Sequence, residues 1–359
     1  MRQDEFIAQG TGLLPEKGEV SWQSPSNIAL VKYWGKKPIQ LPANASISFT
    51  LKNCYTSTKL SFQKANCRTV QVFVDGKEQA SFLKKIKTFF ERIEVYCPYV
   101  KNYAFKIETE NTFPHSSGIA SSASGFSALA LCVLSIERKA SSMKDEGFYK
   151  KASFLSRLGS GSACRSVFGP MAVWGAHEHY VGSSDQFAIP YADVNEVFKS
   201  YQDTILLVDK GEKKVSSTLG HGLMVGHPYA SSRFDQAKNH MIDLQKILKE
   251  GNILAFNGLV EQEALTLHAM MMTSNPYFML FKPNTLNIIH KVWAKREESK
   301  VPFAVTLDAG ANVHLLYPDQ YKQVALQFIR DELIVYCENQ QYICDEVGTG
   351  PLLKTESYA

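Results

Sequence analysis

Residues 26–36 read Ser26-Asn27-Ile28-Ala29-Leu30-Val31-Lys32-Tyr33-Trp34-Gly35-Lys36, and this stretch says most about the fold. An apolar run leads into a lysine, a pair of aromatic residues and a second lysine. Taken alone, the segment is compatible with a buried strand whose lysines reach solvent along their apolar stems. The combination of an amide, two lysines and two aromatic rings is far more specific than such a strand requires.

Outward from this segment, strand-like and helix-like patterns follow one another without regular alternation. Strands are predicted where Thr, Ser, aromatic and β-branched residues gather or alternate, at residues 47–51, 55–62, 70–74, 103–109, 171–174, 205–209, 303–307, 313–317 and 333–337. Helical periodicity and end signals predict helices at residues 81–96, 122–136, 145–158, 232–249, 253–273, 283–296 and 319–330. Residues 1–20 look like a loose leader. This order favours an α+β fold over a doubly wound sheet.

The size of the chain favours two domains. It has 359 residues, 45% of them hydrophobic, which is enough for two medium-sized cores. We place the domains at residues 1–190 and 191–359, because a boundary near 185–200 fits the pattern. The net charge of +4 is too mild to imply binding to nucleic acid or a membrane, although a local cluster of Lys and Arg can still bind an anion.

The cysteines and the N-terminus indicate where the protein resides. Its seven cysteines include no CxxC pair, which is typical of reduced thiols in the cytosol. The N-terminus has no basic segment followed by an apolar run, so it does not look like a signal peptide. No apolar stretch approaches the length needed to span a membrane. We therefore expect a cytoplasmic protein with neither nucleic-acid nor membrane partners.

A run of small residues at 114–125 is the second chemical signal, and reads Pro114-His115-Ser116-Ser117-Gly118-Ile119-Ala120-Ser121-Ser122-Ala123-Ser124-Gly125. It lies between a predicted strand and a predicted helix, where small residues and free helix N–H groups suit phosphate. It is no Walker loop, because GxxxxGK[ST] is absent. It is no nucleophile elbow either, because Gly-x-Ser-x-Gly is not formed. The residues alone leave a phosphate loop and a plain helix-capping turn equally open.

Asn27, Lys32, Tyr33, Trp34 and Lys36 together resemble the N-terminal signature of the diphosphomevalonate decarboxylases, a family of the GHMP kinase superfamily. Residues 111–125 resemble the family's ATP loop, residues 159–169 its GSGSACRS block, and residues 306–312 its DAGPN turn. With the segment at residues 26–36, these blocks follow one another in the order that the family has. Residues 214–218 and 264–269 resemble two further motifs more weakly. The resemblance covers most of the chain. It implies a two-lobed GHMP kinase-like fold with the active site in the cleft between the lobes.

The sequence departs from the family pattern at three positions. Ala311 replaces the proline of the DAGPN turn, which should loosen the turn without removing its carboxylate, because proline acts there by restricting the backbone. His115 stands where the family has a small residue or Thr, and His221 where it often has Met. The two histidines bear on fine nucleotide or substrate contacts and leave the reaction class in place.

The resemblance implies a reaction that needs ATP and Mg²⁺. The family substrate, (R)-5-diphosphomevalonate, is a 3-hydroxy acid that would leave an unstabilised carbanion if it were decarboxylated directly. Phosphorylation of its tertiary hydroxyl creates a leaving group, so that phosphate and carbon dioxide depart together and isopentenyl diphosphate remains. Mg²⁺ would bridge the phosphates of ATP. Its protein ligands cannot be named from the sequence.

The resemblance assigns catalytic roles to Asp308, Lys32 and Arg165. Asp308 would accept the proton of the 3-hydroxyl; without the resemblance, an aspartate satisfied by its own tight turn is the simpler interpretation. Arg165 would hold the substrate carboxylate with its guanidinium fork, where a solvated arginine is the alternative. Lys32 would lower the pKa of Asp308 and balance the charge of the transferred phosphoryl group, where a surface lysine is the alternative.

The remaining predicted site residues bind substrate or nucleotide. Substrate would contact Asn27, Tyr33, Trp34, Lys36, Ser160, Ser162, Arg165 and Ser217. ATP would contact Asn111, Pro114, Ser116, Ser117, Gly118, Ala120, Ser121, Ser122 and Ser124. Each serine alone is more often a turn or cap residue. The family is often dimeric, which implies a homodimer.

Competing functions stay open on the sequence alone. A kinase of the same superfamily would phosphorylate mevalonate or phosphomevalonate and stop there, and a variant decarboxylase would take the monophosphate. A non-catalytic protein could bind a polyanion through Lys84, Lys85 and Lys87, although a solvated helix face explains them as well. His177 and His179 around Glu178 lack a further metal ligand, and His268 is more simply a satisfied core histidine.

Overall fold

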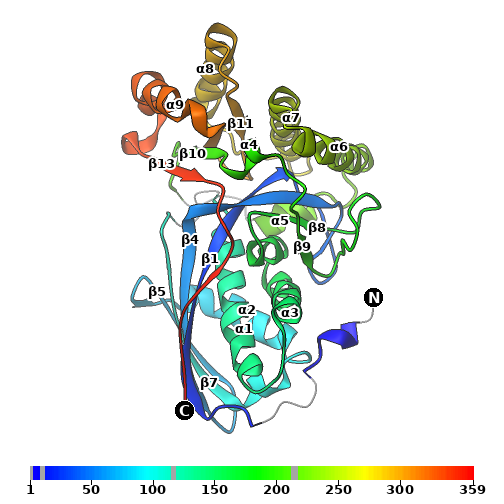
Figure 1. Cartoon of the computed structure of the whole chain (residues 1–359), viewed down its shortest axis with the longest axis vertical. Helices are drawn as coiled ribbons and strands as arrows, with labels where there is room; N and C mark the ends of the chain where they lie inside the picture. Colours follow the sequence, from blue (N-terminus) through cyan, green and yellow to red (C-terminus); the bar gives the residue numbers. More distant parts are fainter. Residues whose placement is uncertain (1–2, 9–12, 115–118, 212–216) are drawn as a thin grey trace.

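The computed structural model describes residues 3–8, 13–114, 119–211 and 217–359. These residues form two lobes, each built from a β-sheet with helices packed against it (Figure 1). No helix in the described ranges is long and apolar enough to cross a lipid bilayer.

The larger sheet carries the long strands β1 (Lys17–Val31) and β4 (Ser46–Lys64). Its order is β14-β1-β4-β7-β5-β6, with β8 paired to β4 and β9 to β8. The other strands are β5 (Thr69–Val74), β6 (Lys77–Glu78), β7 (Tyr103–Asn111), β8 (Met171–Trp174), β9 (Ala188–Pro190) and β14 (Leu352–Tyr358). Neighbours pair antiparallel except β5 and β7, which run parallel. A short β pair, β2 (Lys36–Lys37) and β3 (Leu41–Pro42), lies just beyond the end of β1.

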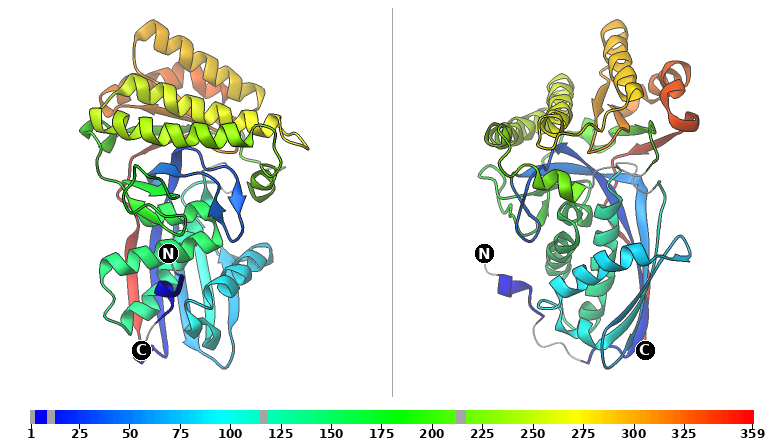
Figure 2. Two further views of the ribbon diagram at one scale, coloured as in Figure 1. Left: turned by 90° about the vertical axis from the view of Figure 1, so that its right-hand side faces the viewer. Right: turned by 180° about the vertical axis from the view of Figure 1, so that it is seen from behind.

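Helices α1 (Ala80–Ile93), α2 (Ser121–Lys139) and α3 (Asp145–Gly159) cover one face of this sheet (Figures 1 and 2). Their apolar faces meet the sheet in one core that includes Phe89, Phe90, Leu131 and Phe148. Helix α2 is apolar nearly all round because it lies between the sheet and α3. The 3-10 helices η1 (Gln3–Phe6), η2 (Pro98–Asn102) and η3 (Gly161–Val167) complete this lobe.

The smaller sheet has the order β11-β12-β10-β13. Its strands are β10 (Gln202–Leu206), β11 (Ala304–Thr306), β12 (Val313–Tyr317) and β13 (Tyr342–Glu346). The helices of this lobe are α4 (Glu196–Lys199), α5 (Ser217–Gly222), α6 (Ala230–Glu250), α7 (Ile253–Met272), α8 (Pro283–Ser299) and α9 (Lys322–Phe328). Helices α6 and α7 run side by side above the end of β1 (Figure 2).

The two sheets are joined by direct contacts rather than by a linker alone. The Asp345 carboxylate in β13 accepts hydrogen bonds from the backbone N–H groups of Lys52, Asn53 and Cys54 in β4, at 2.7–2.8 Å. An isolated bridge pairs Leu51 with Val347. Strand β1 pairs Asn27 with Thr50 beside this junction and continues to Val31, which pairs with Ile47, and it contacts α6 and α7 of the second lobe. The junction therefore brings the segment after β1 close to the second lobe.

Several sequence predictions need correction. Residues 333–337 were expected to form a strand, but they follow α9 as a π-helix, η5 (Ile329–Leu333), and a 3-10 turn, η6 (Ile334–Tyr336). Leu333 and Cys337, four residues apart, are buried in the core while Val335 is exposed, which is helical and not strand spacing. The leader prediction for residues 1–20 is wrong from Lys17, where β1 begins, and Phe6 is buried in the core.

The domain prediction of residues 1–190 and 191–359 does not allow for β14. This strand belongs to the second segment by sequence and to the first sheet by hydrogen bonding, because it pairs antiparallel with β1 (Figure 1). The chain thus crosses from the first lobe to the second and back again.

A buried ion pair between Glu137 in α2 and Lys151 in α3 yields the first prediction. The Lys151 ammonium lies 2.7 and 2.8 Å from the two carboxylate oxygens of Glu137. Glu137→Leu leaves the ammonium buried without its counter-charge, so we expect the free energy of unfolding to fall by about 3–5 kcal/mol. Urea unfolding followed by the fluorescence of Trp22, in the same core, measures this loss.

The double variant Glu137→Leu with Lys151→Met should recover most of the lost stability, because an apolar pair replaces both charges. Glu196→Gln, which breaks a surface ion pair with Lys199, serves as the control and should change stability little. A single Glu137→Leu variant as stable as the wild type would contradict the prediction.

Candidate active site

An ion pair between Lys32 and Asp308 lies at the junction of the two lobes. Lys32 is the first residue after β1, and Asp308 follows β11, so each comes from a different sheet. The Lys32 Nζ lies 3.0 Å from Asp308 Oδ1. The Lys32 side chain is 1% exposed, whereas 25% of the Asp308 side chain remains accessible. A ligand can therefore reach the carboxylate while the ammonium stays within the protein.

The surroundings of Asp308 keep it ionised. Burial acts to raise the pKa of Asp308, but the charge of Lys32 and its hydrogen bond outweigh burial, with smaller contributions from His314 and Arg165, and hold the pKa below its ordinary value. Asp308 is therefore a carboxylate with an accessible oxygen.

Arg165 is buried among neutral groups. It lies on the short helix η3, and its Nε donates to Ser48 Oγ at 2.9 Å while a terminal nitrogen donates to Ser46 Oγ at 2.6 Å. Within the described ranges, no carboxylate lies at ion-pairing distance from it. A buried guanidinium held only by hydroxyl and amide oxygens favours an anionic ligand, since unpaired charge is expensive to bury.

Asn27 orients Arg165 from the neighbouring strand. Its Oδ1 accepts from Arg165 Nε at 3.3 Å, and its Nδ2 donates to Ser166 Oγ at 2.7 Å. Ser160 and Ser162 flank the start of η3 and are partly exposed. The structure thus brings together Asn27, Ser160, Ser162 and Arg165. The predicted direct bond from Asn27 to substrate stays a prediction, because its amide is already engaged.

The Tyr33 hydroxyl is buried and has no hydrogen-bond partner among the described residues. Burial raises the pKa of Tyr33, so the hydroxyl keeps its proton and remains a donor. A Cβ at Gly161 would lie 2.9 Å from this oxygen and 2.7 Å from the Trp174 ring, so only glycine leaves room there. A buried donor without a partner favours an incoming acceptor oxygen.

Trp34 and His221 pack together beside Tyr33. The His221 ring lies 4.4 Å from both the Tyr33 and the Trp34 rings, and its Nδ1 accepts the Gly35 N–H at 3.0 Å. Burial, assisted by Lys36, holds the pKa of His221 well below its ordinary value, so the ring is neutral. Trp34 is buried against Met224, and its predicted contact with substrate stays a prediction.

Lys36 lies in β2, three residues after Tyr33 in the chain and near His221 in space. Burial, with a smaller contribution from the positive charge of Arg92, lowers the pKa of Lys36 to about 8. In the absence of an anion, Lys36 therefore holds its proton only weakly at neutral to slightly basic pH. This segment therefore adds a titratable cation to the site.

The N-terminus of α2 is the predicted nucleotide loop. Helix α2 begins at Ser121 after Ala120, which has a left-handed backbone (φ 51°) and no side-chain acceptor to cap the helix. Ser121 and Ser122 lie in the first turn, whose N–H groups attract an anion. Ser124 is fully buried and its hydroxyl bonds Thr56 Oγ1 at 2.6 Å, so it supports the loop from behind.

Several predicted site residues lie outside the described part of the chain: Ser116, Ser117 and Gly118 of the nucleotide site, and the side chain of the substrate residue Ser217. The family departure at His115 lies outside it too. Pro114 is partly buried at the edge of this segment. Asn111, at the end of β7, accepts a hydrogen bond from Thr56 Oγ1 at 2.7 Å. The nucleotide contacts predicted for all these residues stay predictions.

A cleft beside the start of α2 was not foreseen from the sequence. Its walls combine apolar side chains with Ser121, Ser122 and Asn111. The apolar part is contributed by Val72, Val74, Phe82, Ile86, Ile107, Phe126 and Leu129. These residues come from strands and helices that are separate in the sequence, so no local motif marks them. An apolar slot next to a free helix N-terminus suits a flat base joined to phosphates.

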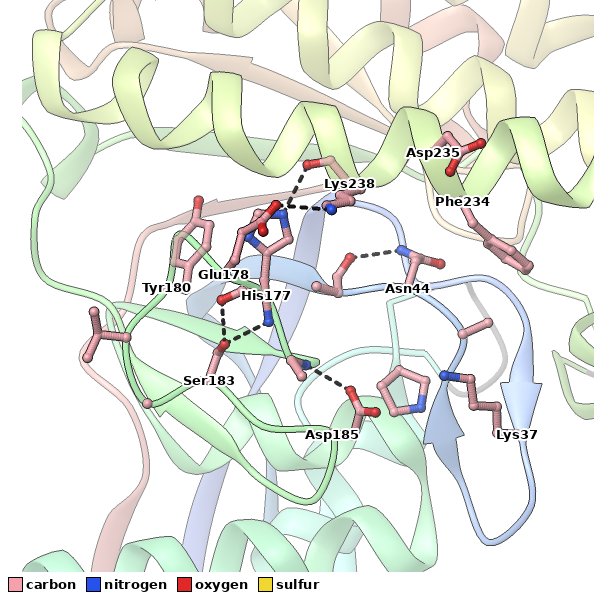
Figure 3. Close-up of a pocket in the computed structure, with 16 residues that line it drawn as sticks. Lys37, Asn44, His177, Glu178, Tyr180, Ser183, Asp185, Phe234, Asp235 and Lys238 are labelled. Atoms are coloured by element: carbon pink, nitrogen blue, oxygen red, sulfur yellow. Dashed lines mark hydrogen bonds and ion pairs between the residues drawn. The ribbon is translucent and has the colours of Figure 1, made fainter. Parts of the chain in front are cut away.

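A broader pocket lies between the β2–β3 pair, the loop at residues 176–185 and α6 (Figure 3). Lys37, His177, Asp185 and Lys238 face it, and none of the predicted site residues lines it. Among the described residues, no group of three His, Cys, Asp or Glu side chains gathers in a way that could hold a metal ion. We assign no ligand to this pocket.

Family models match both halves of the chain. Residues 24–188 match the diphosphomevalonate decarboxylase-like N-terminal domain, and residues 204–354 match the mevalonate 5-diphosphate decarboxylase C-terminal domain. The chain belongs to the diphosphomevalonate decarboxylase family. This confirms the family predicted from residues 26–36 and the later blocks.

Relatives across the diphosphomevalonate decarboxylase family are similar over most of their length. The diphosphomevalonate decarboxylase of Ganoderma lucidum is 29% identical over 327 residues, which cover 85% of this chain and 80% of that protein. The Saccharomyces cerevisiae enzyme is 28% identical over 327 residues, covering 85% and 79%.

Solved structures of the family share the fold. The mevalonate diphosphate decarboxylase from Staphylococcus aureus is 28% identical, with a TM-score of 0.81 over 94% of this chain and 98% of that one. A structure of MDDEF in complex with MVAPP, AMPPCP and magnesium is 28% identical, with a TM-score of 0.82 over 94% and 99%. These likenesses confirm the predicted GHMP kinase-like α+β fold.

The ion pair of this family member yields a prediction about Asp308. Lys32→Met removes the nearest positive charge while three quarters of the Asp308 side chain stays covered, so we expect the pKa of the Asp308 carboxyl to rise above its ordinary value. Carbon-13 NMR titration of aspartate-labelled protein measures the change, with Asp308→Asn assigning the signal. Lys291→Met, on the surface of α8, should leave it in place. The prediction is wrong if Lys32→Met leaves this pKa unmoved.

Proposed function

We propose that the chain is an ATP-dependent lyase that converts (R)-5-diphosphomevalonate into isopentenyl diphosphate, with ADP, phosphate and carbon dioxide as the other products. This is the decarboxylation step of the mevalonate pathway of isoprenoid biosynthesis. The observation that carries the proposal is an accessible, ionised Asp308 paired with buried Lys32 beside an Arg165 that has no carboxylate partner in the described part of the chain. A hydroxy acid needs these three groups for activation and subsequent loss of carbon dioxide.

Asp308 serves the substrate hydroxyl. The carboxylate oxygen that does not bind Lys32 accepts a hydrogen bond from the 3-hydroxyl. It takes the proton as the hydroxyl oxygen of the substrate attacks the terminal phosphate of ATP. Because Lys32 keeps the pKa of Asp308 low, the carboxylate mainly orients the hydroxyl and takes the proton late in the transfer. Lys32 also lies close enough to balance negative charge that develops at the transferred group.

Arg165 serves the other end of the reaction. Its guanidinium binds the substrate carboxylate, with Ser46, Ser48 and Asn27 fixing the orientation of the fork. When the C–C bond breaks, its electron pair forms the alkene and expels the 3-phosphate, and the carboxylate becomes neutral carbon dioxide. Binding to Arg165 is then lost, which favours release of the gas.

The diphosphate end of the substrate is assigned to Tyr33, Lys36, Ser160 and Ser162. Tyr33 offers a buried hydroxyl donor, and Lys36 supplies a cation whose protonation a diphosphate would stabilise. The serines add hydroxyl donors at the start of η3. Ser217, at the first residue of α5, is assigned to the same substrate.

ATP is assigned to the start of α2. The residues present fit it, because the N–H groups around Ser121 and Ser122 lack a side-chain cap from Ala120 and the adjacent apolar cleft accepts an adenine ring. Bound ATP supplies the phosphoryl group, and Mg²⁺ neutralises its phosphates. The MDDEF structure, which contains AMPPCP and magnesium, supports this pair of cofactors. Lys85 borders the cleft and can reach a phosphate or ribose oxygen.

The rival functions separate by their products. A superfamily kinase would form ADP without gas, whereas the monophosphate variant would release gas faster from phosphomevalonate. A polyanion-binding protein would form neither product. Lys84, Lys85 and Lys87, on which that last reading rests, lie on α1 with exposed or cleft-facing side chains. We further propose that the protein works in the cytoplasm, from its free cysteines, and as a homodimer, from the family resemblance.

The decisive assay compares wild type with Asp308→Asn. Wild type should release one carbon dioxide for each ADP formed from diphosphomevalonate, and Asp308→Asn should lower both rates by about 10²–10⁴, because the hydroxyl loses its proton acceptor. A coupled ADP assay with radiolabelled carbon dioxide trapping measures both. Asp319→Asn, an exposed aspartate on the second lobe, is the matched control. ADP without gas from wild type would reassign the chain to the kinases.

The depressed pKa of Lys36 predicts a pH dependence of substrate binding. As the pH rises through about 8, Lys36 in the free enzyme loses its proton, so the affinity for diphosphomevalonate and kcat/KM should both fall. Saturating substrate should keep kcat nearly constant. Steady-state kinetics between pH 7 and 9 measures both.

Lys36→Arg keeps its charge throughout this range and should flatten the decline in kcat/KM. Lys37→Arg, at the adjacent exposed position, is the control and should retain the wild-type profile. An unchanged decline in Lys36→Arg would assign the titration to another group.

A further inference from the structure

Helix α7 contacts both members of the Lys32–Asp308 pair. Glu263 Oε2 accepts the backbone N–H of Lys32 at 2.8 Å. Five residues along the helix, His268 Nε2 lies 3.2 Å from the backbone carbonyl oxygen of Asp308. A carbonyl oxygen can only accept, so His268 Nε2 is the donor. One helix therefore fixes the backbones of two residues that are 276 positions apart in the chain.

Lys32 needs such support because the sheet ends just before it. Strand β1 ends at Val31, whose register partner in β4 is Ile47, and Lys32 has no strand pairing of its own. Side chains, in place of a neighbouring strand, form hydrogen bonds with both the backbone N–H and the carbonyl oxygen of Lys32. Glu263 binds its N–H, while Arg233 and Asn44 donate to its carbonyl oxygen at 3.2 and 2.9 Å.

Glu263 is fully buried, and its charge is balanced within the lobe. Arg233 binds both carboxylate oxygens, at 2.9 and 2.5 Å, and His240 Nδ1 lies 2.5 Å from one of them. Burial acts to raise the pKa of Glu263, but the bond from His240 and the charge of Arg233 outweigh it, so the group stays ionised. A buried ion pair adds little net stability. Its arrangement around Lys32 fits a positioning role better than a purely stabilising one.

His268 is held in a comparable way. It is 1% exposed, and its ring stacks on Phe281 with centroids 4.0 Å apart and planes within 16°. The stacking fixes the ring plane, and the ring then directs Nε2 at the Asp308 carbonyl. The histidine therefore orients the loop that carries the carboxylate through the backbone of Asp308.

We propose that Glu263 and His268 are positioning residues that set the Lys32–Asp308 geometry from α7. The inference rests on the proposed function, in which this pair activates the substrate hydroxyl. Misplacing a reacting group by about 1 Å can lower a rate by about 10²-fold, so small shifts of either backbone matter. The other charged or titratable groups near Asp308 are Arg165 and His314, and those near Glu263 are Arg233 and His240. A substitution on α7 leaves these neighbours in the protein, so its effect on Asp308 can be compared directly with wild type.

The first test asks whether the N–H donor of His268 or its aromatic ring sets the position of Asp308. His268→Phe keeps the stacking on Phe281 and loses the donor, so kcat should fall about 10- to 100-fold with KM for both substrates nearly unchanged. His268→Gln loses the ring but keeps a side-chain N–H, and should recover most of kcat. His290→Phe, an exposed histidine on α8, is the matched control. Equal kcat in His268→Phe and wild type overturns the role of His268.

The second test uses Glu263→Gln. A neutral amide cannot satisfy Lys32, Arg233 and His240 together, so Lys32 should move away from Asp308 and the pKa of Asp308 should rise. The acid limb of the kcat profile then shifts to higher pH, which a loss of stability alone would not cause. An unshifted limb in a folded variant overturns the role of Glu263.

A readout without turnover keeps the two proposals distinguishable. If wild type releases no carbon dioxide from diphosphomevalonate, the proposed function is wrong. Carbon-13 titration of Asp308 in Glu263→Gln still tests the positioning role, since it needs no substrate. A raised Asp308 pKa supports positioning by α7, and an unchanged one overturns it.

Discussion

The side chain of Lys32 is 1% exposed, so its buried charge needs a counter-ion. Because Lys32 lies between the lobes, this need determines how the two lobes meet. Its ammonium can be buried only because Asp308 arrives from the other sheet to meet it. The ion pair therefore ties the end of β1 to the loop after β11, at the same junction where Asp345 binds the backbone of β4. The contact that joins the two lobes here is also the contact that assembles the site.

The charges around this pair are unbalanced in favour of an anionic ligand. Arg165 and Arg157 are both buried, and both donate to neutral oxygens: hydroxyl and amide groups for Arg165, and the carbonyls of Gln186 and Ile39 for Arg157. Burial lowers the pKa of each guanidinium without neutralising it. A substrate with a carboxylate and a diphosphate supplies the charges that this region lacks. Binding should thus stabilise the site as well as fill it.

Residues that act through a contiguous motif could be predicted from the sequence, and those that act across the fold could not. Lys32, Arg165 and Asp308 each lie in a block that resembles a motif of the family, so the resemblance allowed their meeting to be anticipated. From the residues alone, a surface lysine, a solvated arginine and a turn aspartate were the simpler interpretations. Glu263 lies in an ordinary helical pattern. Its role depends on its contact with the backbone of Lys32 after β1, which the sequence around Glu263 does not indicate. The same holds for β14, whose residues are nearly all exposed and show no alternating apolar pattern, so its pairing with β1 could not be read from its own sequence.

The Ala311 departure shows how a contact across the fold can replace a local constraint. Proline in this turn would restrict the backbone through its own ring. Here the carbonyl of Ala311 accepts a hydrogen bond from the buried Thr285 hydroxyl at 2.7 Å. Asn312 donates to the Asp209 carbonyl and accepts the Asp209 N–H, at 3.1 and 2.9 Å. These bonds hold the turn after Asp308 from two sides, and none of them depends on a proline at position 311. The loosening expected from the sequence alone is therefore offset by contacts from α8 and from the segment after β10.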